Sequence, residues 1–415
     1  MGGNPVRRAS PATTPGPGSG AARSGRGSRS GPRAAPVDPE AAASVRLDSG
    51  EPDPGPAALH VVVTHFRRGS AITRATAITT PTISTGDLEA SIELALRRFL
   101  AERRAEAVAI DPRLGPLVDE LEAAVRAGGK RLRPLLAVWG YRAGGAEVDE
   151  PMLRAAAALE LLHTFALIQD DVMDRSPTRR GRPASHVTLA RSAESEPERF
   201  GASAAILLGD LALIWADRML VDSGFPAERL RAGLAVYHEL RTEVTLGQYL
   251  DVLAAHSLQI REEDALKVDR YKTASYTVQR PIQLGLALAG APRALLEAVS
   301  DYAIPAGVAF QLRDDVLGAF GDPDLTGKPS GDDLLQRKPT WLWARTLRRR
   351  PDARYVTDVA LLRRLMIESG VLAEAEDEIQ TLVEQALEAA GRLPVAPELI
   401  DELTTLTERL AWRRS

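Results

Sequence analysis

From Asp87 to the C-terminus the sequence repeats one pattern, in which runs rich in Ala, Leu, Arg and Glu alternate with short breaks. The breaks are Asp111-Pro112, Gly144-Gly145, Gly224-Phe225-Pro226, Gly290-Ala291-Pro292 and Gly321-Asp322-Pro323. Glycine and proline are unfavourable inside helices and mark helix ends. We find neither the alternating β-branched pattern of strands nor a short repeat. We therefore predict one large all-α domain, a helical bundle, over residues 86–415.

The first 85 residues have a different composition. Residues 1–36 hold 8 Gly, 6 Pro, 5 Ser and 6 Arg, with no aromatic and no acidic residue. Such a segment cannot bury enough apolar surface to offset the entropy lost on ordering. We predict a disordered extension over residues 1–85. It lacks the apolar core of a secretory signal, so we expect a cytoplasmic protein.

The composition of the 415 residues excludes several classes of function. There is no cysteine, so disulfides, thiolate metal sites and thiol nucleophiles are ruled out. The net charge of −4 argues against a dedicated nucleic-acid-binding protein. No apolar run reaches 18 residues, so we expect no membrane span.

A carboxylate cluster ends the apolar run that begins at Leu161. Asp170 and Asp174 are four residues apart, so they share one helix face, and His163 lies seven residues earlier on the same stripe. Like charges at this spacing destabilise a bare helix, and a divalent cation between them would remove the repulsion. Ligands that are all oxygen favour Mg²⁺. A solvated acidic helix end would show the same spacing.

A basic run, residues 175–182, follows these acids at once. It contains Arg179 and Arg180. Arginines beside metal-binding carboxylates suit a phosphate or diphosphate, because a guanidinium binds phosphate oxygens in a bidentate manner. The alternative is that these arginines simply pair with the neighbouring aspartates.

A second acidic cluster ends another apolar run. Asp314 and Asp315 close the stretch Tyr302–Leu317, in which we expect Pro305 to cause a kink. Thr326-Gly327-Lys328-Pro329, Asp332-Asp333 and Lys338 follow. The lysines add positive charge beside the acids, although surface lysines near a solvated helix end would look the same.

A third basic element precedes both acidic clusters. Gly128-Gly129 breaks one helical run, and Lys130 and Arg133 lie where the next begins. Backbone N–H groups and the helix dipole favour an anion there. Two basic residues in an ordinary loop would be the simpler interpretation. Taken together, two acidic faces and several cationic anchors suit a cluster of Mg²⁺ ions around one diphosphate, with a second diphosphate nearby.

Taken in their order along the chain, the motifs resemble those of the trans-isoprenyl diphosphate synthases. The resemblance is closest to the geranylgeranyl diphosphate synthases. The resemblance covers about residues 87–415 and rests on the following residues: Gly128–Pro134, Asp170–Asp174 with Arg179-Arg180-Gly181, Lys272-Thr273, Gln311 with Asp314-Asp315, and Gly327-Lys328-Pro329. It implies the all-α isoprenoid synthase fold with a central cavity, and a homodimer. It also implies a reaction in which an allylic diphosphate ionises and isopentenyl diphosphate attacks the resulting cation.

The resemblance also implies roles for individual residues. Asp170, Asp174 and Asp314 would bind Mg²⁺, supported by Asp171 and Asp315. Arg179, Lys272, Lys328 and Lys338 would hold the allylic diphosphate. Lys130, Arg133, His163 and Arg180 would hold isopentenyl diphosphate. Thr273 and Gln311 would line the reacting region and steady the allylic cation, and together with Lys272 they form the predicted catalytic set. The leaving diphosphate usually takes the proton in this family, so no protein base is assigned.

Three positions depart from the family pattern. Gly318 stands where the second motif usually ends in Asp, and Asp322 could compensate if the chain bends back. We expect activity to be retained, because the first Asp of that motif is the main expected ligand. Gln169 replaces a His that often precedes the first motif, and Pro339 replaces a polar or basic residue after Lys338. From Gln169 we expect tuning of activity rather than its loss.

Product length in this family depends on the residues four and five positions before the first Asp. Here these are Ala166 and Phe165. One aromatic at the fifth position and a small residue at the fourth resemble geranylgeranyl diphosphate synthases, which make a C20 product. Phe165 could equally be an ordinary core aromatic.

Three rival functions remain at this point. A terpene cyclase shares the fold, but it typically carries an Asn/Ser/Glu metal motif where Asp314-Asp315 stands. A non-catalytic subunit of a heteromeric synthase would fit Gly318, yet the basic anchors are present. A longer-chain polyprenyl diphosphate synthase differs only in product.

Overall fold

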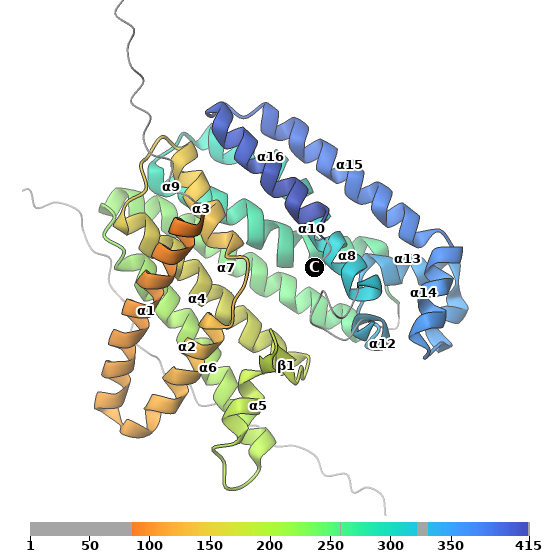
Figure 1. Cartoon of the computed structure of the whole chain (residues 1–415), viewed down its shortest axis with the longest axis horizontal. Coiled ribbons are helices and arrows are strands. Elements are labelled where there is room, and N and C mark those ends of the chain that lie inside the picture. Colours follow the sequence, from red (N-terminus) through yellow and green to blue (C-terminus); the bar gives the residue numbers. More distant parts are fainter. Residues whose placement is uncertain (1–84, 258, 322–330, 414–415) are drawn as a thin grey trace, which may run out of the picture. The chain divides into compact units, whose positions relative to one another are not determined.

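The computed structural model describes residues 85–257, 259–321 and 331–413 (Figure 1). The predicted extension lies almost entirely outside these residues and stays a prediction. The N-terminal half of the described chain contains α1 (Thr85–Ile110), the 3₁₀ turn η1 (Pro112–Leu114), α2 (Gly115–Arg126), α3 (Leu132–Ala143), α4 (Glu150–Met173), β1 (Thr178–Arg179), β2 (Arg182–Pro183), α5 (Ser185–Ala190), α6 (Pro197–Val221) and α7 (Ala227–Ala255).

The C-terminal half is also helical. It contains α8 (Glu262–Val268), the π-helix η2 (Asp269–Gln279), α9 (Arg280–Ala289), α10 (Arg293–Phe320), α12 (Asp332–Leu335), α13 (Trp341–Arg349), the 3₁₀ turn η3 (Pro351–Tyr355), α14 (Val359–Glu368), α15 (Val371–Gly391) and α16 (Pro397–Ala411). The all-α prediction is confirmed, and the strands in the described residues form one two-residue antiparallel pair, β1 with β2.

Local sequence sets the ends of the central helix α4. Asp149 caps its N-terminus, and the Asp149 carboxylate accepts a hydrogen bond from the Met152 amide at 3.0 Å. Pro151 occupies the first turn, where its missing N–H costs nothing. The helix ends at Met173, so Asp170 and Asp171 lie in its last turn and Asp174 is its C-cap.

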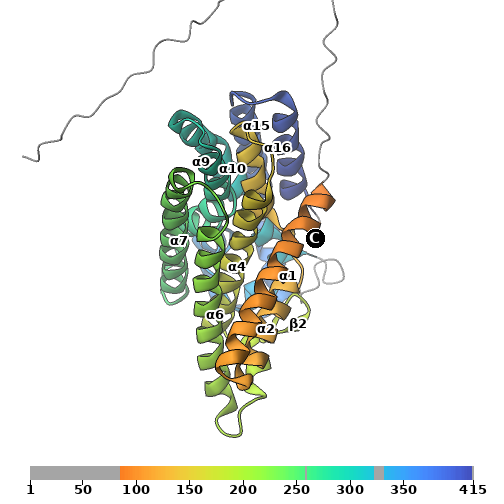
Figure 2. The same ribbon diagram turned by 90° about the vertical axis from the view of Figure 1, so that its left-hand side faces the viewer.

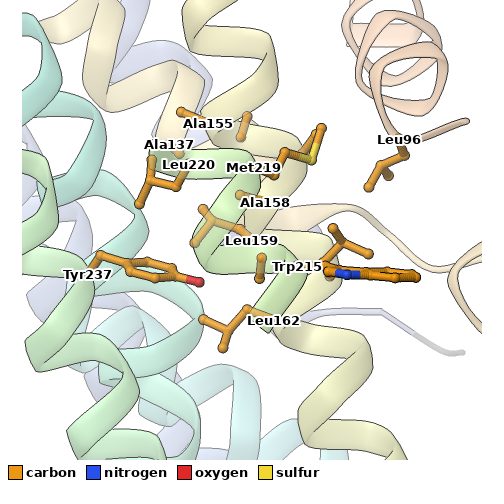
Figure 3. Close-up of a cluster of buried hydrophobic side chains, with 14 of the residues drawn as sticks. Leu96, Ala137, Ala155, Ala158, Leu159, Leu162, Trp215, Met219, Leu220 and Tyr237 are labelled. Carbon is orange, nitrogen blue, oxygen red and sulfur yellow. The ribbon is translucent and has the colours of Figure 1, made fainter. Parts of the chain in front are cut away.

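The main hydrophobic core surrounds α4, which packs against α6, α3 and α1 (Figure 2). Figure 3 shows Leu159 and Leu162 of α4 lying between Tyr237 of α7 and Trp215 of α6. Leu159 and Leu162 are fully buried. Their removal from water contributes about 1.5–3 kcal/mol for each side chain. The core therefore fixes α4 firmly, including the acidic end that it carries.

Close backbone contact positions the π-helix η2 between α7 and α10. A Cβ on Gly247 of α7 would collide with the backbone of Lys272, and one on Gly307 of α10 would collide with Ala274. Both glycines thus allow a helix–helix approach that no other residue would permit. This packing sets the position of Lys272 and its neighbours along the two flanking helices.

Helix α6 is apolar on more than the side that packs on α4. Residues 202–208 are apolar nearly all round, a pattern that predicts a buried segment, yet Ile206 and Leu207 are exposed. Within the described residues, α4 is the one helix long and apolar enough to cross a membrane by length and composition alone, and 61% of its most apolar stretch is buried inside the fold. Burial within the protein accounts for its apolar character. The expectation of no membrane span stays a prediction.

Candidate active site

One cavity of about 460 Å³, here called the central cavity, gathers most of the predicted site residues. Its wall contains residues from six segments of the chain: the loop before α3 with the start of α3, α4, the β1–β2 hairpin, α7, η2 and α10. Among the predicted residues it includes Lys130, Arg133, His163, Ala166, Asp170, Arg179, Arg180, Lys272, Thr273, Gln311 and Asp314. Segments up to 180 residues apart in sequence therefore meet at one place, as the motif order indicated.

The first acidic end consists of Asp170, Asp171 and Asp174. Asp170 lines the central cavity, Asp171 is 3% exposed, and Asp174 is exposed at the helix terminus. Burial opposes ionisation of Asp170, but Lys272 and Arg179 outweigh it and lower the pKa of that carboxyl. Loss of surrounding water raises the pKa of Asp171 and of Asp174. For Asp174 the negative charge on Asp170 adds to the effect.

Two cations hold the first acidic end. The Arg179 Nη2 donates to Asp170 Oδ2 at 3.0 Å and to Asp171 Oδ1 at 2.5 Å. The Lys272 Nζ lies 3.1 Å from Asp170 Oδ1 and 2.5 Å from Asp251 Oδ2. Although burial opposes it, Asp170 and Asp251 raise the pKa of Lys272, so the ammonium stays charged. Without a ligand, the arginine therefore does pair with the aspartates, as the alternative interpretation held.

The second acidic end consists of Asp314 and Asp315 on α10. Asp314 lines the central cavity and forms an ion pair with Arg413, a residue just beyond α16. Asp315 is buried, and its Oδ1 accepts a hydrogen bond from Gln311 Nε2 at 2.8 Å. Its Oδ2 is buried without a partner among the described residues. Burial, together with the neighbouring Asp269, raises the pKa of Asp315 well above its usual range.

The predicted reacting region joins η2 to α10. Thr273 Oγ1 donates to Gln311 Oε1 at 2.7 Å, and the Gln311 amide then donates to Asp315. Both Thr273 and Gln311 line the central cavity. These two successive hydrogen bonds fix the orientation of the Gln311 amide and direct its oxygen to Thr273.

A second group of cations lies at the α3 side of the central cavity. The Arg133 Nη2 donates to Thr277 Oγ1 at 2.7 Å, and its guanidinium lies 4.2 Å from the centre of the Tyr276 ring. Burial, with positive charge from Arg413 and Arg409, lowers the pKa of Lys130 to about 8.

His163 and Arg180 complete this group. Arg180 Nη2 lies 3.5 Å from His163 Nε2, and Arg180 also donates to the Gly128 carbonyl oxygen. A guanidinium can only donate, so this contact requires the Nε2 of a neutral imidazole as acceptor. Burial, followed by the charges of Arg133 and Arg180, lowers the pKa of His163 well below its usual range. Several fixed positive charges without a matching set of carboxylates are suited to a polyanion.

The remaining predicted residues lie elsewhere. Lys338 forms an ion pair with Asp333 at 3.1 Å and is outside the wall of the central cavity. Lys328 and Asp322 lie outside the described residues. Of the predicted chain-length pair, Ala166 lines the cavity, whereas Phe165 is partly buried against the main core.

The space beside Gly318 is filled by another acid. A Cβ at Gly318 would collide with the Asp333 carboxylate. The family's second motif usually has an Asp at the position of Gly318. Here a carboxylate does lie next to that position, and it belongs to Asp333 of α12.

A match to a family model decides the assignment. The polyprenyl synthetase family matches residues 116–374, which contain both acidic ends and both groups of cations. The chain belongs to the polyprenyl synthetase family. The resemblance, the all-α isoprenoid synthase fold and the assignment as a prenyltransferase that makes trans-polyprenyl diphosphates are thereby confirmed.

Several known polyprenyl synthetases are similar over most of the chain. A geranylfarnesyl diphosphate synthase of Aeropyrum pernix is 32% identical, over 68% of this chain and 89% of its own length. A geranylgeranyl diphosphate synthase of Methanosarcina mazei is 35% identical over 52% of this chain and 63% of its own length. A geranylgeranyl pyrophosphate synthase of Corynebacterium glutamicum, solved with isoprenyl diphosphate and magnesium, has a TM-score of 0.76 and 37% identity, and the match covers 79% of this chain and 99% of that one.

The residues of this polyprenyl synthetase fit Mg²⁺ that is shared with a substrate. Asp170 and Asp314 offer carboxylate oxygens at the cavity wall, and such oxygens are the ligands Mg²⁺ prefers. Within the described residues, no three His, Asp or Glu side chains converge closely enough to hold a metal on their own. The protein thus supplies part of a coordination shell, and diphosphate oxygens and water would complete it.

Sequence reasoning missed several residues of the cavity wall. Tyr276 and Thr277 follow Lys272-Thr273 by one turn of η2, and Gln248 of α7 donates to Asp170 Oδ1 at 3.2 Å. A helical spacing of four from Lys272 and Thr273 would have identified Tyr276 and Thr277. No local signal marks Gln248 or Arg413, because tertiary packing alone brings them to the site.

Proposed function

We propose that this polyprenyl synthetase condenses isopentenyl diphosphate with an allylic diphosphate, in the presence of Mg²⁺, to form geranylgeranyl diphosphate. One observation carries the proposal: the central cavity holds two acidic ends and two separate groups of cations around one space. Two diphosphates need two cationic anchors, and the ionising one also needs metal. The names of the relatives, which include geranylgeranyl diphosphate synthases, agree with this reaction.

The allylic diphosphate would lie between the two acidic ends. Mg²⁺, when bound by Asp170, Asp174 and Asp314, would stabilise the negative charge that develops on the leaving diphosphate. Lys272 and Arg179 would add fixed positive charge, once metal and substrate release them from their aspartate partners. Lys328 and Lys338 are proposed for the same diphosphate, and Asp171 and Asp315 for support of the metal ligands.

Isopentenyl diphosphate would bind at the α3 side. Lys130, Arg133 and Arg180 would hold its diphosphate, with neutral His163 beside them and in contact with Arg180 through its Nε2. Its double bond would then face the allylic carbon. The allylic carbon–oxygen bond would break first, and the double bond of isopentenyl diphosphate would then form the new carbon–carbon bond to the allylic cation. The departed diphosphate would take the proton that is lost.

The reacting region would protect the intermediate cation. Thr273 and Gln311 present hydroxyl and amide oxygens at the cavity wall, so their dipoles would steady the positive charge. Leu167 and Val244 line the same space, and an apolar wall keeps water away from the cation.

We further propose that Phe165 sets the product length. The proposal rests on the family resemblance and on the position of Phe165 next to Ala166, which lines the cavity; Phe165 itself is partly buried against the main core. The relatives carry the names of more than one product length, so a direct test is needed.

A homodimer is proposed on the exposed apolar side chains of two neighbouring helices. Leu207 and Ile214 of α6 and Tyr249 and Leu253 of α7 are all more than half exposed. Large apolar residues gathered at a surface mark an interface. A second copy of the chain is the proposed partner, and molecular mass in solution, measured by light scattering, tests it. A monomer at micromolar concentration would contradict it.

The function is tested by incubating the protein with Mg²⁺, isopentenyl diphosphate and, in turn, dimethylallyl, geranyl or farnesyl diphosphate. Products are dephosphorylated and sized by mass spectrometry. We expect a dominant C20 alcohol. Longer products would keep the synthetase and reject the C20 assignment. No product with any primer would favour a non-catalytic subunit of a heteromeric enzyme.

The chain-length proposal has its own variant, Phe165→Ala. We expect longer products from a folded protein, because the smaller side chain opens the end of the cavity. Phe165→Tyr keeps the bulk and is the matched control, for which we expect C20. Unchanged C20 output from folded Phe165→Ala would show that this residue is an ordinary core aromatic.

A further inference from the structure

Arg131 has a different set of contacts from the two cations that flank it in sequence. Its Nη1 donates to Glu160 Oε2 at 2.5 Å, and its Nη2 donates to the Val125 carbonyl oxygen at 2.9 Å. Val125 lies in the last turn of α2 and Glu160 in the middle of α4. Arg131 therefore ties two helices together from within the loop that carries Lys130 and Arg133.

The backbone of this loop needs such a tie. Arg131 has φ 46° and ψ 32°, a left-handed conformation that is unfavourable for a residue with a Cβ. Gly128 and Gly129 before it have φ of 88° and 140°. The two glycines adopt such angles readily, but a left-handed arginine persists only where surrounding contacts determine it. In the described structure, the Arg131 side chain supplies contacts on two sides.

Burial indicates that the pair acts on the protein rather than on a ligand. The Glu160 side chain is 4% exposed and that of Arg131 is 10% exposed. The guanidinium is already neutralised by a carboxylate, so it adds little to the attraction of a diphosphate. Glu160 also lies one helical turn before His163, and its carboxylate is near Arg180. The Arg131 and Glu160 side chains both border the central cavity, but they are nearly covered and are paired with each other. Glu160 is thus placed where it can order the cationic group.

We propose that Glu160 and Arg131 are positioning residues, a buried latch that holds the loop 128–133 so that Lys130 and Arg133 face the second diphosphate. This inference rests on the proposed function, because it assigns that diphosphate to isopentenyl diphosphate. The latch acts through the loop and takes no part in ionisation of the allylic substrate. Its loss should therefore affect one substrate and spare the other.

Steady-state kinetics of Glu160→Gln test the latch. Glutamine keeps the size and a hydrogen-bond acceptor but removes the charge that holds Arg131. We expect KM for isopentenyl diphosphate to rise by roughly 10- to 100-fold, while KM for farnesyl diphosphate changes less than threefold. An equal rise in both constants, or no rise in either from a folded variant, would overturn the proposal.

A control separates positioning from loss of stability. Glu262→Gln breaks a partly buried ion pair with Arg345, at 2.7 Å, outside the wall of the central cavity. We expect it to lower the unfolding temperature while leaving both KM values unchanged. A selective rise in KM for isopentenyl diphosphate in this control too would overturn the latch.

A second variant covers the case in which Glu160→Gln does not fold. The double variant Glu160→Leu/Arg131→Met replaces the pair by apolar side chains, a change that buried ion pairs often tolerate. We expect it to fold and still to show the selective rise in KM. If the unaltered protein does not turn over, the proposed function fails, and calorimetry with inorganic pyrophosphate decides the latch separately. Unweakened pyrophosphate binding by the folded double variant would then overturn it.

Discussion

The two acidic ends of the central cavity resemble each other in sequence but are held differently. Asp170 is contacted by Lys272, Arg179 and Gln248, from three separate segments of the chain. Asp314 forms an ion pair with Arg413, and that arginine comes from the C-terminal segment. The first end is therefore set in a ready-made group of cations, whereas the second end depends on the last residues of the chain.

Within each pair of adjacent aspartates, the structure separates the two roles. Asp170 and Asp314 line the cavity, whereas Asp171 and Asp315 are buried. Consecutive residues on a helix point about 100° apart, so one carboxylate of each pair can face a ligand while the next faces the interior. On the proposed function, one carboxylate of each shared motif would bind metal and the other would hold the helix end.

The largest effect is expected for the aspartates that face the cavity. We expect Asp170→Asn and Asp314→Asn each to lower kcat roughly 100- to 1000-fold, because the developing charge on the leaving diphosphate loses a metal ligand. Measurement of kcat at saturating Mg²⁺ checks this. If one variant kept nearly full activity, the two ends would not share one metal–diphosphate cluster.

Gly318→Asp restores the usual family residue, and we expect it to harm the protein. The new side chain would collide with Asp333 and place two carboxylates together, at a cost of about 1–3 kcal/mol. We expect lower thermal stability and no gain in kcat. The matched control, Gly318→Asp with Asp333→Ala, should recover stability. A higher kcat for Gly318→Asp would show that the added carboxylate helps catalysis more than its collision with Asp333 harms it.

A smaller effect, on stability, is expected for Asp315→Asn. Burial and Asp269 raise the pKa of Asp315, so the folded state holds a proton that the unfolded state releases. The contribution of Asp315 to the free energy of unfolding is therefore full below the unfolded pKa of 3.8, and it is lost as the pH rises toward the folded pKa. Asparagine resembles the protonated acid, so it should raise the unfolding temperature of the ligand-free protein at pH 8. A lower unfolding temperature would mean that the ionised form is preferred.

The smallest effect concerns pH and His163. Because burial and nearby arginines lower its pKa, the folded protein keeps His163 neutral, while the unfolded chain takes up a proton below about pH 6.5. Stability should therefore fall as pH drops from 7 to 5. His163→Gln should make that decline shallower, as followed by chemical denaturation at each pH. An identical slope in both proteins would refute a depressed pKa.

Sequence alone predicted those parts of the molecule that depend on local pattern. Leu88, Ile92, Leu96, Phe99 and Leu100 recur at helical spacing after Asp87, and all five are buried in α1, which begins at Thr85. Gly290 ends α9 in the left-handed conformation that its place in a break implied. The first acidic motif ends α4 as predicted, and the second lies in the last two turns of α10.

Features that depend on tertiary contacts escaped sequence reasoning. The π-helix η2 follows from close approach to Gly247 and Gly307, which lie far away in sequence. Asp333 fills the space beside Gly318, where Asp322 was considered instead. The pairing of Arg413 with Asp314 joins residues 99 positions apart. Such contacts are set by how helices pack, and no local periodicity reports them.

The central claim is that both acidic ends hold one Mg²⁺–diphosphate cluster. Calorimetry with farnesyl thiolodiphosphate, an analogue that ionises poorly, tests it without turnover. We predict tight binding to the unaltered protein with Mg²⁺, and binding at least tenfold weaker with EDTA, or with Asp170→Asn or Asp314→Asn. Equal affinity with and without Mg²⁺, or in either variant, would contradict the account.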